Sequence, residues 1–95
     1  MKFEWDARKN RANIRKHGIP FEVAQEVFED PFCFTIPDQF IDDEERLWTV
    51  GRIESLSVLV VVHVLYVEDG DEIVRMISAR RATPGERRLY EETQR

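Results

Sequence analysis

The sequence is organised around the segment Val74-Arg75-Met76-Ile77-Ser78-Ala79-Arg80-Arg81-Ala82, which begins as an apolar strand and gathers arginines towards its end. Because side chains alternate between the two faces of a strand, an uninterrupted strand places Arg75 and Arg81 on one face with Ile77. Arg80 then joins Ser78 on the opposite face. Arginine is costly to bury without a partner, and its planar fork of donors suits phosphate oxygens, so these side chains need either acidic neighbours or an anionic ligand.

Turn and cap signals flank this segment on both sides. Upstream, Asp69-Gly70 between two apolar runs predicts a tight hairpin that returns the chain from a central strand at Leu56–Tyr66. Downstream, Thr83-Pro84-Gly85-Glu86 is a capping box with proline at the first helical position, which predicts a final helix. The apolar face of that helix is thin, with Leu89 and Tyr90 alone, so we expect it to lie loosely on the sheet or to depend on a partner.

The N-terminal half predicts two helices and two further strands. Asp6 is a typical N-cap, Gly18 a typical helix end, and Asp30-Pro31 a stop signal. Together with the segments above, these elements predict an α+β fold with two N-terminal helices, a four-stranded, mostly antiparallel sheet and a C-terminal helix. The predicted elements of this half are helices at Ala7–Lys16 and from Pro20, strands at Phe32–Ile36 and Glu45–Ile53, and a polar loop at Pro37–Glu44.

Length and composition fit one small domain. The chain has 95 residues, of which 42% are hydrophobic and 35% charged, so we expect a single folded domain over 1–95. Cys33 is the one cysteine, so neither a disulfide framework nor a cysteine-based zinc cluster is expected, which fits a reducing cytoplasm. No apolar stretch typical of a signal peptide opens the chain, and the longest apolar run, Val58–Val62, is far too short to cross a bilayer.

Charge is segregated along the chain, although the net charge is only −5. Lys2–His17 has six basic and two acidic residues, Glu22–Glu45 has nine acidic and no basic ones, and Arg75–Arg88 has five arginines and one glutamate. Such a chain can present a basic face to a polyanion despite its acidic total. The acidic middle could line the opposite face or receive a basic partner.

The acidic run Asp42-Asp43-Glu44-Glu45 raises the question of a metal site, because clustered carboxylates bind Mg²⁺ or Ca²⁺. Consecutive residues seldom converge on one ion without glycines to bend the backbone, and the spacing of a calcium-binding loop is absent. We therefore interpret the run as a solvated loop and expect neither a metal ion nor another cofactor.

Both histidines have a structural interpretation beside a catalytic one. Lys16 and His17 fall in the last turn of the first helix, where cations complement the helix dipole. His63 interrupts an otherwise apolar strand, where a histidine is more often a satisfied core or edge residue than a catalyst. Asn13, on the first helix, is interpreted as an ordinary surface residue.

A series of short motifs spans the chain in order. The motifs are Phe3-Glu4-Trp5-Asp6, Asn13 with Lys16-His17-Gly18, Phe21 with Ala24 and Val27-Phe28, Asp30-Pro31, Glu45-Arg46 before Gly51-Arg52, Ile77-Ser78-Ala79-Arg80, and Glu86-Arg87 with Tyr90. Together, at near-constant spacing, they resemble the BrnT family of bacterial toxins, which are ribonucleases with a RelE-like fold. No single motif is specific, and Pro20 departs from the pattern, since relatives often carry a serine there that is able to cap the second helix.

The resemblance implies a toxin that cleaves RNA and thereby stops translation. It also implies a neighbouring gene for a BrnA-like antitoxin, which binds and neutralises the toxin. Because the antitoxin is usually the DNA-binding half, the toxin would join a hetero-oligomeric repressor complex and meet DNA through its partner.

Metal-free cleavage of RNA needs a base for the 2′-OH proton, an acid for the departing 5′ oxygen, and cations for the charge growing on the phosphate. Arginine suits the third role and is almost never a base, because it stays protonated. Tyr90 could donate a proton or stack a base. The sequence does not fix which pair transfers the protons. The candidate catalytic residues are Arg80, Arg81, Glu45, His63, His17 and Tyr90, and the candidate substrate-binding residues are Arg46, Arg52, Arg75, Ser78 and Lys16.

Alternatives stay open beside the ribonuclease hypothesis. The arginines could form an ion-pair lattice across the sheet, in a non-catalytic binding or regulatory partner with a basic face. A metal-dependent nuclease is a more distant hypothesis, because no carboxylates are spaced to share an ion. The lattice would pair Glu45 with Arg75 or Arg81, and Glu86 with Arg80 or Arg87.

Overall fold

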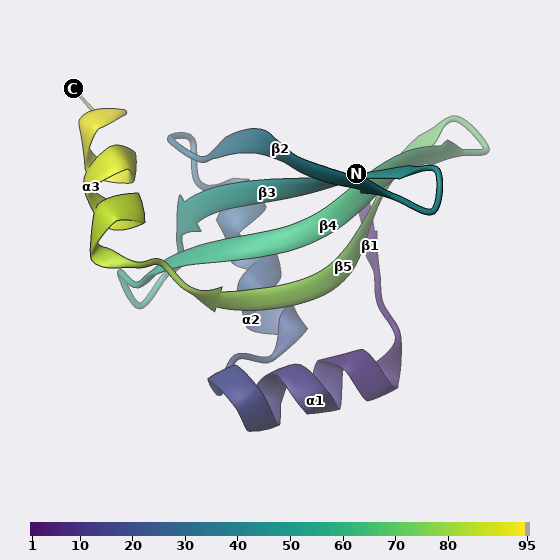
Figure 1. Cartoon of the computed structure of the whole chain (residues 1–95), viewed down its shortest axis with the longest axis horizontal. Helices are drawn as coiled ribbons and strands as arrows, with labels where there is room; N and C mark the ends of the chain where they lie inside the picture. Colours follow the sequence, from purple (N-terminus) through teal and green to yellow (C-terminus); the bar gives the residue numbers. More distant parts are fainter. Residues whose placement is uncertain (95) are drawn as a thin grey trace.

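The computed structural model describes residues 1–94 of the chain. These residues form a five-stranded sheet and three α-helices, the second of which continues into a 3-10 turn (Figure 1). The elements, in chain order, are β1 (Lys2–Glu4), α1 (Ala7–His17), α2 (Phe21–Ala24), the 3-10 turn η1 (Gln25–Glu29), β2 (Phe34–Ile41), β3 (Glu44–Arg52), β4 (Val58–Glu68), β5 (Asp71–Arg81) and α3 (Pro84–Glu92).

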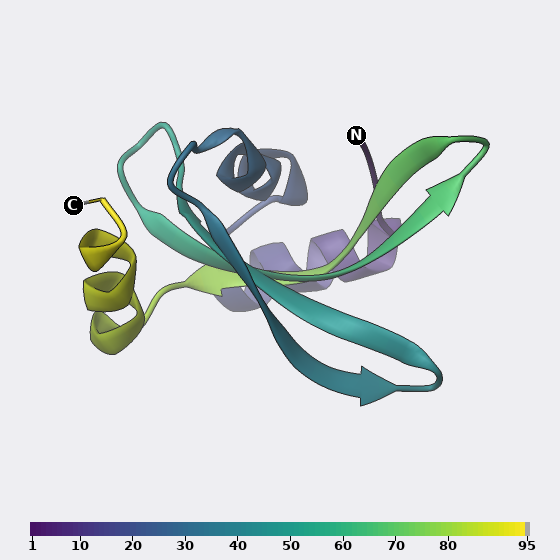
Figure 2. The same ribbon diagram turned by 90° about the horizontal axis from the view of Figure 1, so that it is seen from above.

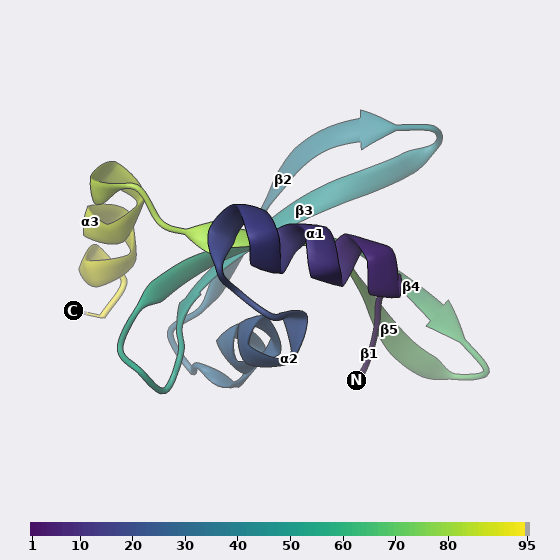
Figure 3. The same ribbon diagram turned by 90° about the horizontal axis from the view of Figure 1, so that it is seen from below.

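The strands lie in the order β1-β5-β4-β3-β2, and β1 pairs with β5 in parallel while the other neighbours are antiparallel. Figure 3 shows α1 and α2 on one side of the sheet and α3 at one end of it. The β2–β3 and β4–β5 hairpins extend from the other end and splay apart (Figure 2). The α+β class is confirmed, but the predicted count of four strands is wrong. β1 is too short to show an alternating pattern, and its partner lies at the far end of the sequence.

Two apolar clusters, one on each face of the sheet, hold the elements together. On the face covered by α2 and η1, which we name the helix face, Phe21 and Val27 pack in one cluster with Val61 of β4. On the opposite face, which we name the open face, Tyr90 of α3 packs with Val60. Burying an apolar side chain of this size contributes roughly 1.5–3 kcal/mol, so both clusters are substantial for so small a chain.

The outer strand β2 is longer than the sequence indicates. The expected strand over 32–36 and loop over 37–44 are replaced by a strand that runs over 34–41. Pro37 is tolerated inside it because β2 is the edge of the sheet, where one row of backbone groups needs no partner, and because the register shifts just after this residue.

Two tight turns use positive φ angles. Asp42 and Asp43, at φ 50° and 62°, turn the chain between β2 and β3, so the acidic run makes a turn and the start of a strand instead of a loop. Asp69 and Gly70, at φ 51° and 82°, turn the chain between β4 and β5. The predicted Asp-Gly hairpin is therefore confirmed.

A β-bulge interrupts the pairing of β4 with β5. His63 pairs with Met76, and the preceding residue, Val62, pairs with Ser78. Ile77 is thus an extra residue on β5, without a partner of its own on β4. An extra residue of this kind shifts the side-chain alternation of one strand by one position.

The bulge changes which arginines share a face. Arg75, Ser78 and Arg80 pair with even-numbered residues of β4 and lie on the open face, whereas Arg81 pairs with Leu59 and lies on the helix face. The expectation that Arg75 and Arg81 share a face is therefore wrong, because it assumed an unbroken strand.

The predicted helix ends are confirmed. The side chain of Asp6 accepts a hydrogen bond from the Arg8 N–H at 2.7 Å, and Gly18 ends α1 with φ 72°. Thr83 and Glu86 form a reciprocal capping box at the start of α3. These signals are local, so the sequence is enough to predict them.

Asn13 is not the surface residue that the sequence indicates. It is 5% exposed, and its side chain donates to the backbone oxygens of Ile19 and Ala79, both at 2.9 Å, and accepts from the Ala79 N–H at 3.0 Å. Asn13 thereby satisfies backbone groups of β5 that β1 is too short to reach, and it fastens α1 to the sheet.

α3 is anchored by one aromatic side chain. Tyr90 is 1% exposed, whereas Leu89 is 51% exposed and does not serve as the contact that the sequence indicates. The hydroxyl of Tyr90 donates a hydrogen bond to Asp30, the residue that ends η1. The helix is therefore held by a buried phenol rather than by an apolar stripe.

Candidate active site

A basic groove of about 470 Å³ runs between α1 and the last residues of β5. Its lining contains no carboxylate, so cationic and neutral polar groups dominate it. We define the basic groove by its polar side chains, Lys9, Lys16, His17, Ser78 and Arg80; Ala12, Asn13 and Ile77 complete it.

The spacing of residues along α1 and the packing of α1 against β5 explain why these side chains meet. Lys9, Lys16 and His17 lie at helical spacing on the side of α1 that carries Asn13, which is bonded to β5. Ser78 and Arg80 lie two residues apart and share a face of β5, beyond the part of its edge that β1 covers, and α1 packs along that edge through Asn13. Four of the predicted site residues, Lys16, His17, Ser78 and Arg80, are thus brought together, although they come from opposite ends of the chain.

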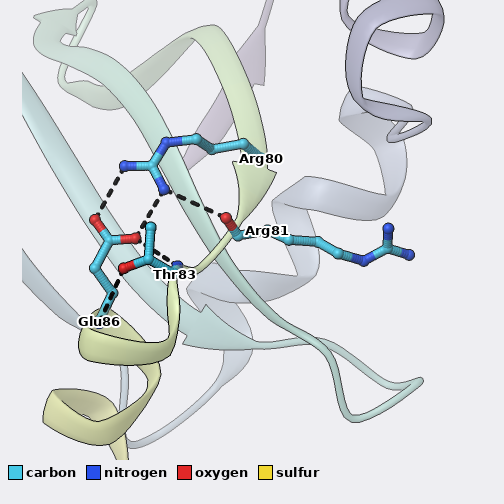
Figure 4. Close-up of polar contacts among 4 residues, drawn as sticks. All are labelled: Arg80, Arg81, Thr83 and Glu86. Atoms are coloured by element: carbon cyan, nitrogen blue, oxygen red, sulfur yellow. Dashed lines mark hydrogen bonds and ion pairs between the residues drawn. The ribbon is translucent and has the colours of Figure 1, made fainter.

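Arg80 is the most constrained member of the groove. Its Nη1 and Nη2 donate to the two carboxylate oxygens of Glu86 at 2.7 and 3.0 Å, and Nη1 also donates to the Arg81 carbonyl at 3.3 Å (Figure 4). Its guanidinium carbon lies 5.1 Å from the centre of the Trp48 ring, within range of a cation–π contact. The predicted pair of Glu86 with Arg80 is confirmed.

Glu86 stays ionised at neutral pH. The hydrogen bond from Arg80 lowers the pKa of Glu86 to about 2, against the opposing effect of burial. A carboxylate with so low a pKa is a poor proton acceptor. Its chemistry is therefore that of a fixed negative charge beside the groove.

The remaining candidates on β5 and its neighbours lie apart from the groove. Arg81 is exposed, and Figure 4 shows its side chain pointing away from Arg80 and Glu86. Glu45 is exposed in the β2–β3 hairpin and pairs with no arginine among residues 1–94, so its predicted pairing with Arg75 or Arg81 is wrong. Arg75 pairs instead with Glu4 at 3.7 Å.

The alternation predicted for β3 is confirmed, and it separates two further candidates. Arg46 and Arg52 both lie on the open face, near opposite ends of the strand, and neither lines the basic groove. The guanidinium of Arg52 lies 5.4 Å from the centre of the Tyr90 ring, while its backbone N–H donates to Asp30 at 2.7 Å. Arg52 thus belongs to the support of α3.

Tyr90 and Asp30 form a structural pair at the same place. Burial opposes the charged form of Asp30, but hydrogen bonds from Arg52, Tyr90 and Phe32 outweigh it and lower the pKa of this carboxyl. Burial and the bond to Asp30 raise the pKa of Tyr90. The phenol proton is therefore committed to Asp30, and the structure does not bring Tyr90 to the basic groove.

His63 is a core residue. It is 1% exposed, its Nε2 lies 2.7 Å from the hydroxyl of Thr49, and its ring meets Phe28 edge-on with centroids 5.1 Å apart. Burial lowers its pKa to about 4, so the imidazole is neutral at neutral pH. The structural interpretation of His63 is the one that the geometry favours.

His63 makes the stability of the protein pH-dependent. The folded pKa of about 4 lies below the ordinary 6.5, so the unfolded chain binds more protons between these values and stability falls as the pH drops from 6.5 to 4. The expected loss is about 3 kcal/mol at the acid end. Urea unfolding of wild type and His63→Leu at several pH values measures it, and the variant should show a flatter dependence. Equal slopes in the two proteins would contradict the assignment.

Sequence reasoning missed Lys9 and Trp48 and treated Asn13 as a surface residue. Lys9 and Lys16 are seven residues apart, the spacing of one helix face, so the helical prediction contained a usable signal for that pair. Nothing local indicates that Trp48 lies beneath Arg80, because the two residues come from strands separated by β4.

Two features of residues 1–94 bear on other functions. No group of three or more His, Cys, Asp or Glu side chains is arranged to hold a metal ion there. Within the same residues, every helix falls short of the length and apolar character that crossing a membrane requires.

Comparisons with known proteins agree on one protein family. The family model described as "Ribonuclease toxin, BrnT, of type II toxin-antitoxin system" matches residues 5–86. A 1.1 Å crystal structure of the Brucella abortus ribonuclease toxin BrnT is similar, with a TM-score of 0.66 and 28% sequence identity. That similarity covers 87% of this chain and 97% of the Brucella chain. No curated protein sequence matches the chain.

Proposed function

Because the chain belongs to the BrnT family of ribonuclease toxins of type II toxin–antitoxin systems, we propose that it cleaves RNA without a metal ion and does so at the basic groove. Family membership supports this reading and not the alternative of a non-catalytic partner. A toxin of this family implies RNA as its target and an antitoxin as its partner.

The observation that carries the proposal is the composition of the basic groove. Lys9 and Lys16 supply two cations, Arg80 supplies a third that it shares with Glu86 beside the groove, Ser78 supplies a hydroxyl, and no carboxylate is among the lining residues. Basic side chains at this density fit a phosphodiester. The net charge of −5 is no obstacle, because the local field steers the ligand.

His17 is the group in the groove that we assign to proton transfer. An imidazole ring carries a nitrogen that can accept a proton and an N–H that can donate one, so it suits general acid–base catalysis. Attack of the 2′ oxygen on phosphorus needs a proton removed, and departure of the 5′ oxygen needs one supplied. Lys9, Lys16 and Arg80 would stabilise the negative charge that grows on the phosphate between these events.

The wider setting follows the family. We propose one domain over residues 1–95 with a RelE-like arrangement, acting in the cytoplasm. We also propose a BrnA-like antitoxin that forms a hetero-oligomer with the toxin and carries the contact with DNA. These statements rest on family membership.

A cleavage assay in EDTA tests the proposal. Purified wild-type chain should cleave a defined RNA in the chelator, and His17→Asn should lose about 10²-fold or more in rate, since acid–base groups contribute on that order. Arg15→Ala is the matched control, because Arg15 is an exposed cation of α1 outside the lining of the basic groove. Cleavage that stops in EDTA, or that survives in His17→Asn, would contradict the metal-free mechanism or the role of His17 respectively.

A further inference from the structure

The guanidinium of Arg80 has one occupied end and one free edge. Of its five N–H groups, Nη1 uses two, to Glu86 and to the Arg81 carbonyl, and Nη2 uses one, to the second Glu86 oxygen. Figure 4 shows the carboxylate meeting the outer end of the guanidinium. The Nε–H and the second Nη2–H remain, and these two lie side by side on one edge of the planar group.

This edge is available to a ligand. No hydrogen bond within residues 1–94 involves Arg80 Nε, and the atom is not among the buried polar atoms that lack a partner. Two parallel N–H groups on one edge form the fork that binds two oxygens of a phosphate. Arg80 also lines the basic groove, where the phosphate of RNA is expected.

Glu86 fixes the orientation of that edge. An arginine side chain has many rotamers, but the bidentate carboxylate and the Trp48 ring, 5.1 Å from the guanidinium carbon, define one position. Glu86 is itself held, because its Oε1 accepts from the Thr83 N–H at 2.8 Å. The cap of α3 and the orientation of Arg80 therefore depend on the same carboxylate.

We propose that Glu86 is a positioning residue, which holds Arg80 so that the Nε–Nη2 edge of its guanidinium binds two oxygens of an RNA phosphate. The inference rests on the proposed function, since it assigns a phosphate of RNA to this edge. It goes beyond that function because it gives Glu86 a part in recognising the RNA phosphate. An ordinary ion pair at the surface would have no such part. Holding a charged fork in place before substrate arrives lowers the cost of reorganisation in the transition state.

Two variants separate positioning from helix capping. Glu86→Gln keeps an oxygen for the Thr83 N–H, as glutamine does in other capping boxes, but loses the charged bidentate grip on Arg80. Thr83→Ala removes the cap oxygen and leaves Glu86 with Arg80. We expect Glu86→Gln to lower kcat about 10-fold or more with little change in Tm. Thr83→Ala should lower Tm by roughly 5 °C and leave kcat within about twofold. If kcat fell in both variants only in proportion to the loss of stability measured by Tm, the proposal would be overturned.

A binding measurement makes the outcome independent of cleavage. A 2′-O-methyl RNA oligonucleotide has no free 2′-OH and stays intact, and the Nε–H signal of Arg80 can be followed by NMR as it is added. The signal should shift on binding in wild type and shift less in Glu86→Gln. A wild-type signal that does not move overturns the proposal. A signal that moves in a protein without nuclease activity supports the positioning of Arg80 and instead refutes the ribonuclease assignment.

Arg80→Lys is the second variant, in case Glu86→Gln fails to fold. Lysine keeps the positive charge and lacks the fork, so oligonucleotide affinity and kcat should both fall although the net charge is unchanged. Full activity in Arg80→Lys would show that charge alone is needed, and the role of Glu86 in orienting a fork would then be refuted.

Discussion

Replacing Arg80 with alanine is expected to lower the rate of RNA cleavage by about 10²- to 10³-fold, the usual effect of removing one group that stabilises transition-state charge. Arg80 lines the basic groove, pairs with Glu86 and stacks on Trp48. The adjacent Arg81→Ala should change the rate by less than about threefold. Arg81 lies on the other face of the sheet, so it acts on the RNA only through the overall electrostatic field of the protein.

This pair of variants is a matched control within one chain. Both remove one arginine from the end of β5, so a shared effect of net charge cancels in the comparison. Single-turnover cleavage of a defined RNA in EDTA gives the rates, and circular dichroism verifies that both proteins are folded. Equal losses in the two variants, or no loss in Arg80→Ala, would remove the basic groove from consideration as the active site.

Replacing Asn13 with aspartate is expected to destabilise the fold by about 3 kcal/mol or more, because a buried group without its hydrogen bonds costs roughly 1–3 kcal/mol and several are affected at once. The Nδ2 group donates to the carbonyls of Ile19 and Ala79, and a carboxylate oxygen in its place would face both carbonyls without a proton. The shape of the side chain is unchanged, so packing is conserved and hydrogen bonding alone is tested.

Thermal unfolding measures the effect. A loss of this size lowers the Tm of a chain of this length by on the order of 15 °C. Arg11→Ala, an exposed substitution on the same helix, should stay within about 0.5 kcal/mol of wild type. If Asn13→Asp unfolds at the wild-type temperature, the contact between α1 and β5 is not what holds the basic groove together.

Local signals in the sequence were sufficient for much of the fold. Asp6, Gly18 and the Thr83–Glu86 box each determine a helix end through contacts within a few residues. Asp69-Gly70 determines a hairpin because few residues tolerate positive φ. The alternation along Glu45–Ile53 was likewise enough to assign its two faces. The family resemblance, carried by motifs along the whole chain, is confirmed by the family model over residues 5–86.

The candidate site depended on long-range geometry. Lys16, His17, Ser78 and Arg80 are each visible in the sequence as chemical candidates, but so are Glu45, Arg81 and His63, and nothing local separates the two groups. A single extra residue at Ile77 reverses the faces of everything after it in β5, and strand periodicity alone cannot reveal a bulge that arises from pairing with β4.

By itself, then, the sequence determined the class of fold, the helix ends, one hairpin and the family, because each depends on neighbouring residues or on the order of motifs. The tertiary structure alone decided which charged residues meet. Asn13 reaches across 66 positions to Ala79, and this contact, together with the bulge at Ile77, joins α1 to the arginine-bearing end of β5. Contacts of that range depend on how the elements pack, and no short window of sequence contains the information.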